Sequence, residues 1–165
     1  MTDNRVDPTR PHELSDPPEW QRRLETAGLV VMGRAVPDGF PEVMSAVYAV
    51  NGIEVQPSDS ISDSLVDAAA ELDRRWDARA AAVRLVSAAG EFYILAPGPG
   101  GHEVGWIHVA DTVGRALPSR IAAATGSRSF IALSLDGTSL CAVSVEEYDL
   151  WIVTHSFDGV QSEGR

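Results

Sequence analysis

The amino-acid sequence predicts an α+β fold in which helices cover one face of a mainly antiparallel meander sheet of five to six strands. Up to residue 79, apolar residues recur mostly at helical spacing, whereas beyond it they alternate with polar residues at a period of two. The predicted strands are separated by short turns, which join only antiparallel neighbours because a parallel return needs a crossover of about a dozen residues. Of the 165 residues, 44% are apolar, which is enough for one domain around a single core.

The two ends of the chain differ in composition from its middle. Residues 1–15 contain Pro8, Pro11 and several charges but almost no apolar side chain. We expect them to be disordered, because so little apolar surface cannot offset the entropy of ordering. Residues 158–165 are expected to form a flexible tail. The single domain is therefore predicted to span residues 16–157.

The first elements of this domain are a helix and a strand. Asp16, followed by two prolines, is a suitable N-cap for a helix that Gly28 can end. A strand is expected from Leu29 to about Val36, because the turn residues Pro37-Asp38-Gly39 follow it.

The next stretch leaves two interpretations open. Valines at helical spacing predict a helix over 41–50 that stops at Asn51-Gly52, yet the same Asn-Gly pair lies between two apolar runs and is also a typical hairpin turn. We favour the helix. A polar connector over 57–62 then leads into a helix predicted over 62–79, in which apolar residues follow one face.

The second half of the chain is predicted to be mainly strands, because β-branched and aromatic residues gather there. The expected strands are residues 81–87, 91–96, 103–109, 129–135, 139–145 and 149–156. The interval Ala110–Gly126 predicts a helix, capped by Asp111, that breaks or restarts near Leu117 because Pro118 cannot continue it.

This order of elements is similar to that of the profilin-like and roadblock-like dimerising modules. The likeness is one of element order alone, since no sequence motif of either family is present, and it does not fix a function.

The charge of the chain excludes several classes of function. With 13 basic and 24 acidic residues the formal charge is 13 − 24 = −11, and all the basic residues are arginine. Without lysine, a P-loop, a Schiff-base enzyme and a lysine general base are excluded. The negative surface repels phosphate backbones and anionic lipids, so we expect neither a nucleic-acid nor a membrane partner.

Cys141 is the single cysteine, which excludes an intramolecular disulfide and fits a reducing compartment. No apolar signal segment follows Met1, and no apolar run approaches the length of a spanning helix. We therefore expect a cytoplasmic protein.

A glycine-rich loop between two predicted strands is the first candidate for chemistry. Its glycines permit close backbone approach, so successive amides in the segment 97–102 can form a nest for an anion. We favour the simpler interpretation of a mobile hairpin loop, because Gly and Pro mark turns generally. The candidate ligand-binding residues are Gly98, Gly100, Gly101, His102, His108 and His155.

No metal site, cofactor or catalytic set is predicted. His102 and His108 lie six residues apart, about 20 Å along an extended strand, which is too far for one ion. Cys141 alternates with valines in a predicted central strand, where an apolar environment raises the pKa of a thiol and keeps it unreactive. Glu146 and Glu147 fit a solvated turn better than an acid–base pair.

These observations favour a non-catalytic acidic protein-interaction module, such as an adaptor, a regulator or an immunity-type inhibitor. It would bind a basic protein, or a second copy of itself as a homodimer, through a sheet face or an edge strand such as 149–156, with exposed aromatic residues beside acids. The candidate partner-binding residues are Trp106, Trp151, Tyr148, Glu146, Glu147 and Asp149. The alternative is a small-ligand-binding domain or enzyme whose pocket lies near the 97–102 loop, His108 and His155.

Overall fold

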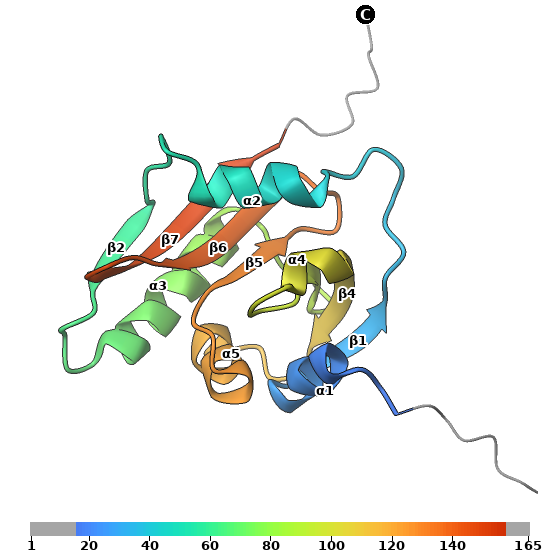
Figure 1. The fold of residues 1–165 in the computed structure, drawn as a ribbon, viewed down its shortest axis with the longest axis horizontal. Helices are drawn as coiled ribbons and strands as arrows, with labels where there is room; N and C mark the ends of the chain where they lie inside the picture. The colour runs from blue at the N-terminus through green and yellow to red at the C-terminus, as the bar shows by residue number, and fades with distance from the viewer. Residues whose placement is uncertain (1–15, 158–165) are drawn as a thin grey trace, which may run out of the picture.

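The computed structural model describes residues 16–157, so the expected disordered lead and flexible tail lie outside the described residues. Within this range the chain forms an open antiparallel sheet of seven strands with five helices (Figure 1). The strand order is β1-β4-β3-β5-β6-β7-β2. The α+β class and the antiparallel sheet are therefore confirmed, with a seventh strand beyond the five or six expected.

The helices are α1 (Glu19–Thr26), α2 (Val43–Asn51), α3 (Ala68–Ala82), α4 (Gly101–Val104) and α5 (Leu117–Thr125). The strands are β1 (Leu29–Gly33), β2 (Asp59–Ser62), β3 (Glu91–Leu95), β4 (Trp106–Asp111), β5 (Phe130–Leu133), β6 (Ser139–Val145) and β7 (Asp149–Ser156). None of the helices in this part of the chain is long and apolar enough to cross a membrane.

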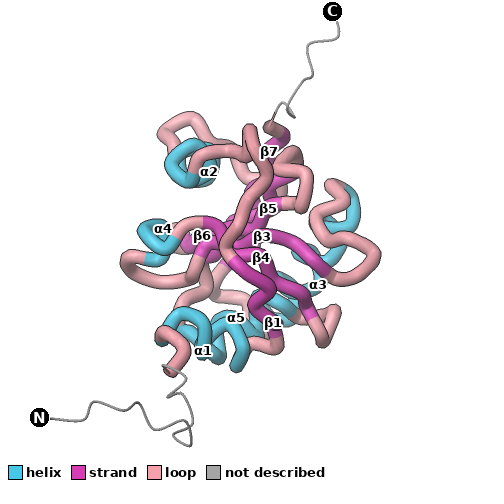
Figure 2. Tube along the Cα trace, turned by 90° about the vertical axis from the view of Figure 1, so that its right-hand side faces the viewer, coloured by secondary structure: helices cyan, strands magenta, loops and turns pink. Residues whose placement is uncertain are grey.

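Helices cover both faces of the sheet, not one face as the sequence predicted. Leu24 of α1, Trp76 of α3 and Ile121 of α5 belong to the main core on one face. Ala46 and Val50 of α2 belong to a second core on the other. Figure 2 shows α2 and α4 on the opposite side of the strands from α3.

The second core explains why a strict period of two was the wrong expectation for the central strands. In β6, Cys141 and Val143 face the main core, whereas Leu140 and Ala142 face the second one. A strand buried on both faces has a continuous apolar run instead of an alternating pattern.

Residues 81–87 do not form the expected strand. Helix α3 continues to Ala82, in an alanine-rich stretch that favours helix. The chain then turns through Arg84, whose φ is 54°, and buries Leu85. The strand prediction was wrong because Ala81 and Ala82 continue the helix and the residues after them form the turn that follows it.

The polar connector predicted over 57–62 contains an edge strand. Residues Asp59–Ser62 pair with β7 as β2, and only Ile61 among them is fully buried. The helix expected from residue 62 therefore begins later, at Ala68.

Two helices agree with the prediction from sequence, although one pattern was ambiguous and the other was interrupted by proline. The helix expected over 41–50 is present as α2 (Val43–Asn51), which settles the choice between helix and hairpin. The restart near Pro118 is confirmed, because α5 begins at Leu117. Asp111 ends β4 instead of capping a helix, and its Oδ1 accepts the backbone N–H groups of Val113 at 2.9 Å and Gly114 at 3.1 Å.

Candidate functional site

Two segments far apart in the sequence meet at one end of the sheet. The pairing of β2 with β7 places Ser62 opposite Asp149, and the backbone N–H of Asp63 donates to the carbonyl oxygen of Tyr148 at 2.9 Å. The β6–β7 turn therefore lies beside the β2–α3 loop, at the left of Figure 1. We call this surface the acidic end; it consists of Asp63, Leu65, Val66, Asp67, Val145, Glu146, Glu147, Tyr148 and Asp149.

Exposed apolar side chains lie among the acids of this surface. Val66 is fully exposed, Tyr148 is 72% exposed, and Leu65 and Val145 are each 47% exposed. Among residues 16–157, Asp63 is the only one of the five acids with an ion-pair partner, and Arg128 Nη1 lies 2.9 Å from its Oδ1. The surface is therefore negative and partly apolar.

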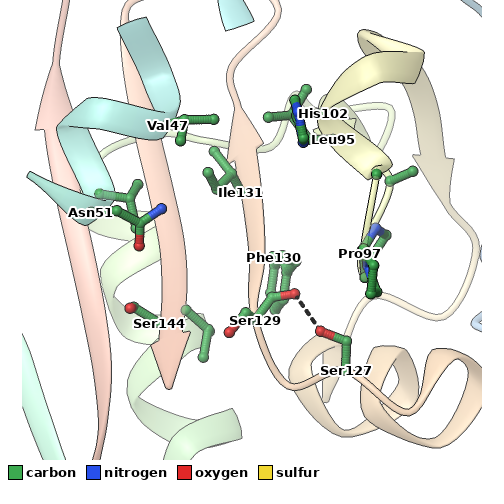
Figure 3. Close-up of a pocket in the computed structure, with 16 residues that line it drawn as sticks. Val47, Asn51, Leu95, Pro97, His102, Ser127, Ser129, Phe130, Ile131 and Ser144 are labelled. Carbon is green, nitrogen blue, oxygen red and sulfur yellow. Dashed lines mark hydrogen bonds between the residues drawn. The ribbon is translucent and has the colours of Figure 1, made fainter. Parts of the chain in front are cut away.

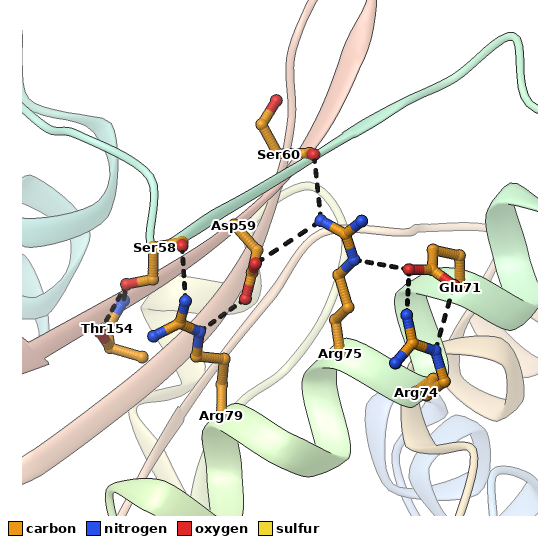
Figure 4. Close-up of polar contacts among 8 residues, drawn as sticks. All are labelled: Ser58, Asp59, Ser60, Glu71, Arg74, Arg75, Arg79 and Thr154. Carbon is orange, nitrogen blue, oxygen red and sulfur yellow. Dashed lines mark hydrogen bonds and ion pairs between the residues drawn. The ribbon is translucent and has the colours of Figure 1, made fainter.

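An ion-pair network holds β2 against α3 and so positions the β2–α3 loop (Figure 4). Arg79 Nε lies 2.6 Å from Asp59 Oδ2, and Arg75 Nε lies 2.7 Å from Glu71 Oε1. Arg74 binds the same glutamate, and the two arginines lower the pKa of Glu71 through these hydrogen bonds. The three arginines of α3 are therefore paired with the carboxylates of Glu71 and Asp59.

The two tryptophans on strands, Trp106 and Trp151, do not form one surface with the acidic end. Trp106 is 5% exposed, and its Nε1 donates to the carbonyl oxygen of Pro41 at 2.9 Å. The ring of Phe40 packs edge-on against it, with 5.9 Å between centroids. Trp151 is partly buried and packs against the second core. The expectation that Trp106 is exposed was wrong, because Phe40 and Pro41 cover its ring.

The three described histidines lie in three different places. His102 is exposed on α4, and His155 near the end of β7 packs on Phe157 with 4.6 Å between ring centroids. His108 on β4 stacks on Tyr93, and its Nε2 lies 3.1 Å from Glu91 Oε1 without the geometry of a hydrogen bond. They do not converge on one carboxylate.

The glycine-rich loop borders a cavity of about 520 Å³ between α2, β5 and α4 (Figure 3). Gly98, Gly100 and His102 line this cavity, whereas His108 and His155 lie outside it. Gly101 packs against the end of β3, where a Cβ atom would stand 1.6 Å from the carbonyl oxygen of Ala96. The lining residues are Val47, Val50, Asn51, Leu95, Ala96, Pro97, Gly98, Pro99, Gly100, His102, Ser127, Ser129, Phe130, Ile131, Val143 and Ser144.

Cys141 is fully buried in β6, and this burial raises the pKa of its thiol. The thiol is therefore a poor nucleophile. In the described part of the chain, no group of three or more His, Cys, Asp or Glu side chains is arranged to hold a metal ion.

Comparison with known proteins gives no relative. No family model, curated protein or solved structure matches this chain.

Sequence reasoning found only part of the two candidate sites. Tyr148, Glu146, Glu147 and Asp149 were predicted and lie together in the acidic end. Leu65 was expected on the buried face of the helix predicted over 62–79, and Val66 was missed because β2 was not predicted, although the order Ser60-Ile61-Ser62 has the period of a strand. Asn51 and Ser144 of the cavity carry no local signal, since only the folded sheet brings them together.

Proposed function

We propose that this chain is a non-catalytic interaction module that binds a basic protein surface through the acidic end. The observation that supports the proposal is the meeting of five carboxylates with exposed Tyr148, Val145, Leu65 and Val66 where β2 pairs with β7. Such a surface combines long-range attraction, which speeds encounter, with apolar anchors, which lengthen the lifetime of a complex.

The charge of the acidic end favours a basic partner over a second copy of the chain. Two copies that met through this surface would oppose five carboxylates to five, and like charges in contact cost several kcal/mol. Arg128 is the only arginine that the structure pairs with one of these acids within residues 16–157. A partner that supplies lysine or arginine around an apolar contact complements the surface.

The position of the histidines supports this proposal over the enzyme alternative. A pocket that used His108 and His155 beside the 97–102 loop would need all three elements at one cavity. The cavity beside this loop is lined by His102 but by neither of the other two.

Charge reversal at the acidic end tests the proposal. The variant E146K/E147K should lose, by about tenfold or more, a partner that wild type captures from native lysate, because both attraction and local complementarity are reversed. The matched control is D38K/E42K, which makes the same change of charge at two exposed acids near α2. Quantitative mass spectrometry of the captured proteins provides the measurement.

With the captured partner in purified form, stopped-flow kinetics should show an association rate that falls as salt is added. The proposal fails if E146K/E147K captures as much of the partner as D38K/E42K does, or if D38K/E42K alone loses the partner. A rate that does not respond to salt also contradicts it.

A further inference from the structure

The sheet opens between two of its central strands. Strand β3 pairs with β4 over five residues, but with β5 only through Tyr93 with Leu133 and Ile94 with Ala132. Beyond this point Leu95 remains paired with β4, while the first residues of β5 remain paired with β6. The cavity of about 520 Å³ lies beside this opening.

Both walls of the cavity are fixed by the fold. Val47 and Val50 come from α2, which packs on β5 and β6. On the other side, the loop is held close to β3, since only glycine fits at Gly101 beside the carbonyl oxygen of Ala96. A cavity with fixed walls binds a ligand without a large ordering cost.

The lining contains no charged side chain. Charged residues make up 22% of the chain, yet none of the sixteen residues that line the cavity is Asp, Glu or Arg. A buried ion needs a partner of opposite charge, because burial without one is costly. The lining itself therefore offers an ionic ligand no countercharge.

The polar groups at the cavity divide into two kinds. The serines are engaged: Ser127 Oγ donates to the carbonyl oxygen of Ser129 at 3.1 Å, and Ser144 Oγ donates to Glu146 Oε1 at 2.9 Å. The side chains of Asn51 and His102 form no hydrogen bond with other residues of 16–157, and they stand on opposite walls (Figure 3). They are free to bind a polar group of a ligand.

From these observations we propose that the cavity binds an uncharged, mainly apolar small molecule, whose hydrogen-bonding group is held by Asn51 or His102. The volume lies within the range of about 300–1,000 Å³ that is usual for small-molecule sites. The apolar body rests on Val47, Val50 and Ile131. The cavity borders the acidic end where Ser144 donates to Glu146, but the proposed ligand does not require the protein partner.

A pair of fluorescent probes that differ in one charge tests the proposal. N-phenyl-1-naphthylamine is neutral, and 8-anilino-1-naphthalenesulfonate has the same aromatic amine with an added sulfonate. The full chain should bind the neutral probe at one saturable site, at least about tenfold more tightly than the sulfonate, because the lining offers the sulfonate no countercharge.

Filling the cavity should abolish this binding. Val47→Trp places a large ring between the walls and should reduce the affinity for the neutral probe by about tenfold or more. Met44→Trp is the matched control, because it adds the same ring to the exposed side of the same helix, where Met44 is 43% exposed. Circular dichroism checks that each variant is folded, and Ile131→Phe replaces Val47→Trp if the latter does not fold.

Equal affinity for the two probes would overturn the proposal. So would neutral-probe binding that persists in a folded cavity-filling variant or disappears in Met44→Trp. E147K, which alters the acidic end but keeps the hydrogen bond from Ser144 to Glu146, should bind the neutral probe as wild type does. This variant separates a failure of the present proposal from a failure of the protein-docking proposal.

Discussion

At the scale of single residues, Asp136 shows how one turn residue stabilises the fold through its hydrogen bonds. It lies in the β5–β6 turn, and its Oδ1 accepts hydrogen bonds from Ser134 Oγ at 2.6 Å and from Thr138 Oγ1 at 2.7 Å. The backbone N–H of Thr138 donates to the same oxygen at 3.0 Å. These hydrogen bonds lower the pKa of Asp136 below its usual value of 3.8, and the bond from Ser134 has the largest effect.

We expect Asp136→Asn to reduce the free energy of unfolding by about 1 kcal/mol near neutral pH, because the amide accepts these hydrogen bonds less strongly than the carboxylate. The lowered pKa means that the stabilisation is complete above about pH 4 and is lost as the pH falls through the pKa of the folded state. Urea unfolding at neutral and acidic pH measures this difference. Asp38→Asn, in an exposed turn, is the control, and a difference that grows on acidification would contradict the prediction.

Some residue roles follow from local chemistry and others do not. The burial of Cys141 and the restart at Pro118 were predictable, because each depends on the residue itself and its neighbours in sequence. The burial of Trp106 was not, since the carbonyl group that binds its indole belongs to Pro41, 65 positions away.

At the scale of elements, arginines close one edge of the sheet. The bond from the N–H of Asp63 to Tyr148 sets the alternation of the β2–β7 ladder, so the carbonyl group of Ser60 points away from β7. Arg79 Nη2 donates to the carbonyl oxygen of Ser58 at 2.9 Å, and Arg75 Nη1 lies 3.5 Å from that of Ser60. The outer edge of β2 is therefore occupied by side chains of α3.

Arg79→Met should loosen β2, because it removes the ion pair with Asp59 and the bond to Ser58 while keeping a side chain of similar length. Amide hydrogen exchange in residues 57–66 should become about tenfold faster, which corresponds to about 1.4 kcal/mol of local stability. Arg74→Met is the matched control, since Arg74 is 71% exposed on the same helix and binds Glu71 instead of β2. Equal exchange in the two variants would show that the network does not hold the strand.

The elements that could be predicted from sequence are those whose own pattern decides them. Helix α1 and strands β3, β6 and β7 follow from their apolar residues and the turn residues beside them, whereas the pattern of α2 also allowed a hairpin. Strand β2 depends on its pairing with β7 and on arginines of α3, which its own sequence does not indicate. The apolar residues over 81–87 suggested a strand, but the alanine-rich end of α3 continues into this segment as a helix. The cavity depends on a split between β3 and β5, which no local pattern records.

At the scale of the whole molecule, the net charge of −11 opposes compact folding. We expect the melting temperature to rise by a few degrees between about 10 mM and 150 mM salt, because the screening length falls from about 30 Å to about 8 Å. E146K/E147K has a charge of −11 + 4 = −7 and should show a smaller rise. Scanning calorimetry measures both, and a melting temperature that falls with salt would contradict this prediction.

The two margins of the sheet differ, and the difference limits how chains can add to one another. The arginine-covered margin at β2 offers no free row of carbonyl groups, whereas β1 carries exposed Val30 and Met32 and, within residues 16–157, no comparable arginine bond to Leu29 or Val31. Of the two margins, the β1 margin is the one without such arginine bonds in the described residues, although Leu29 itself is buried, so an added strand could pair only beyond Leu29. Two chains joined there would present blocked margins on both outer sides, so growth would stop at a pair and would not continue into a fibre.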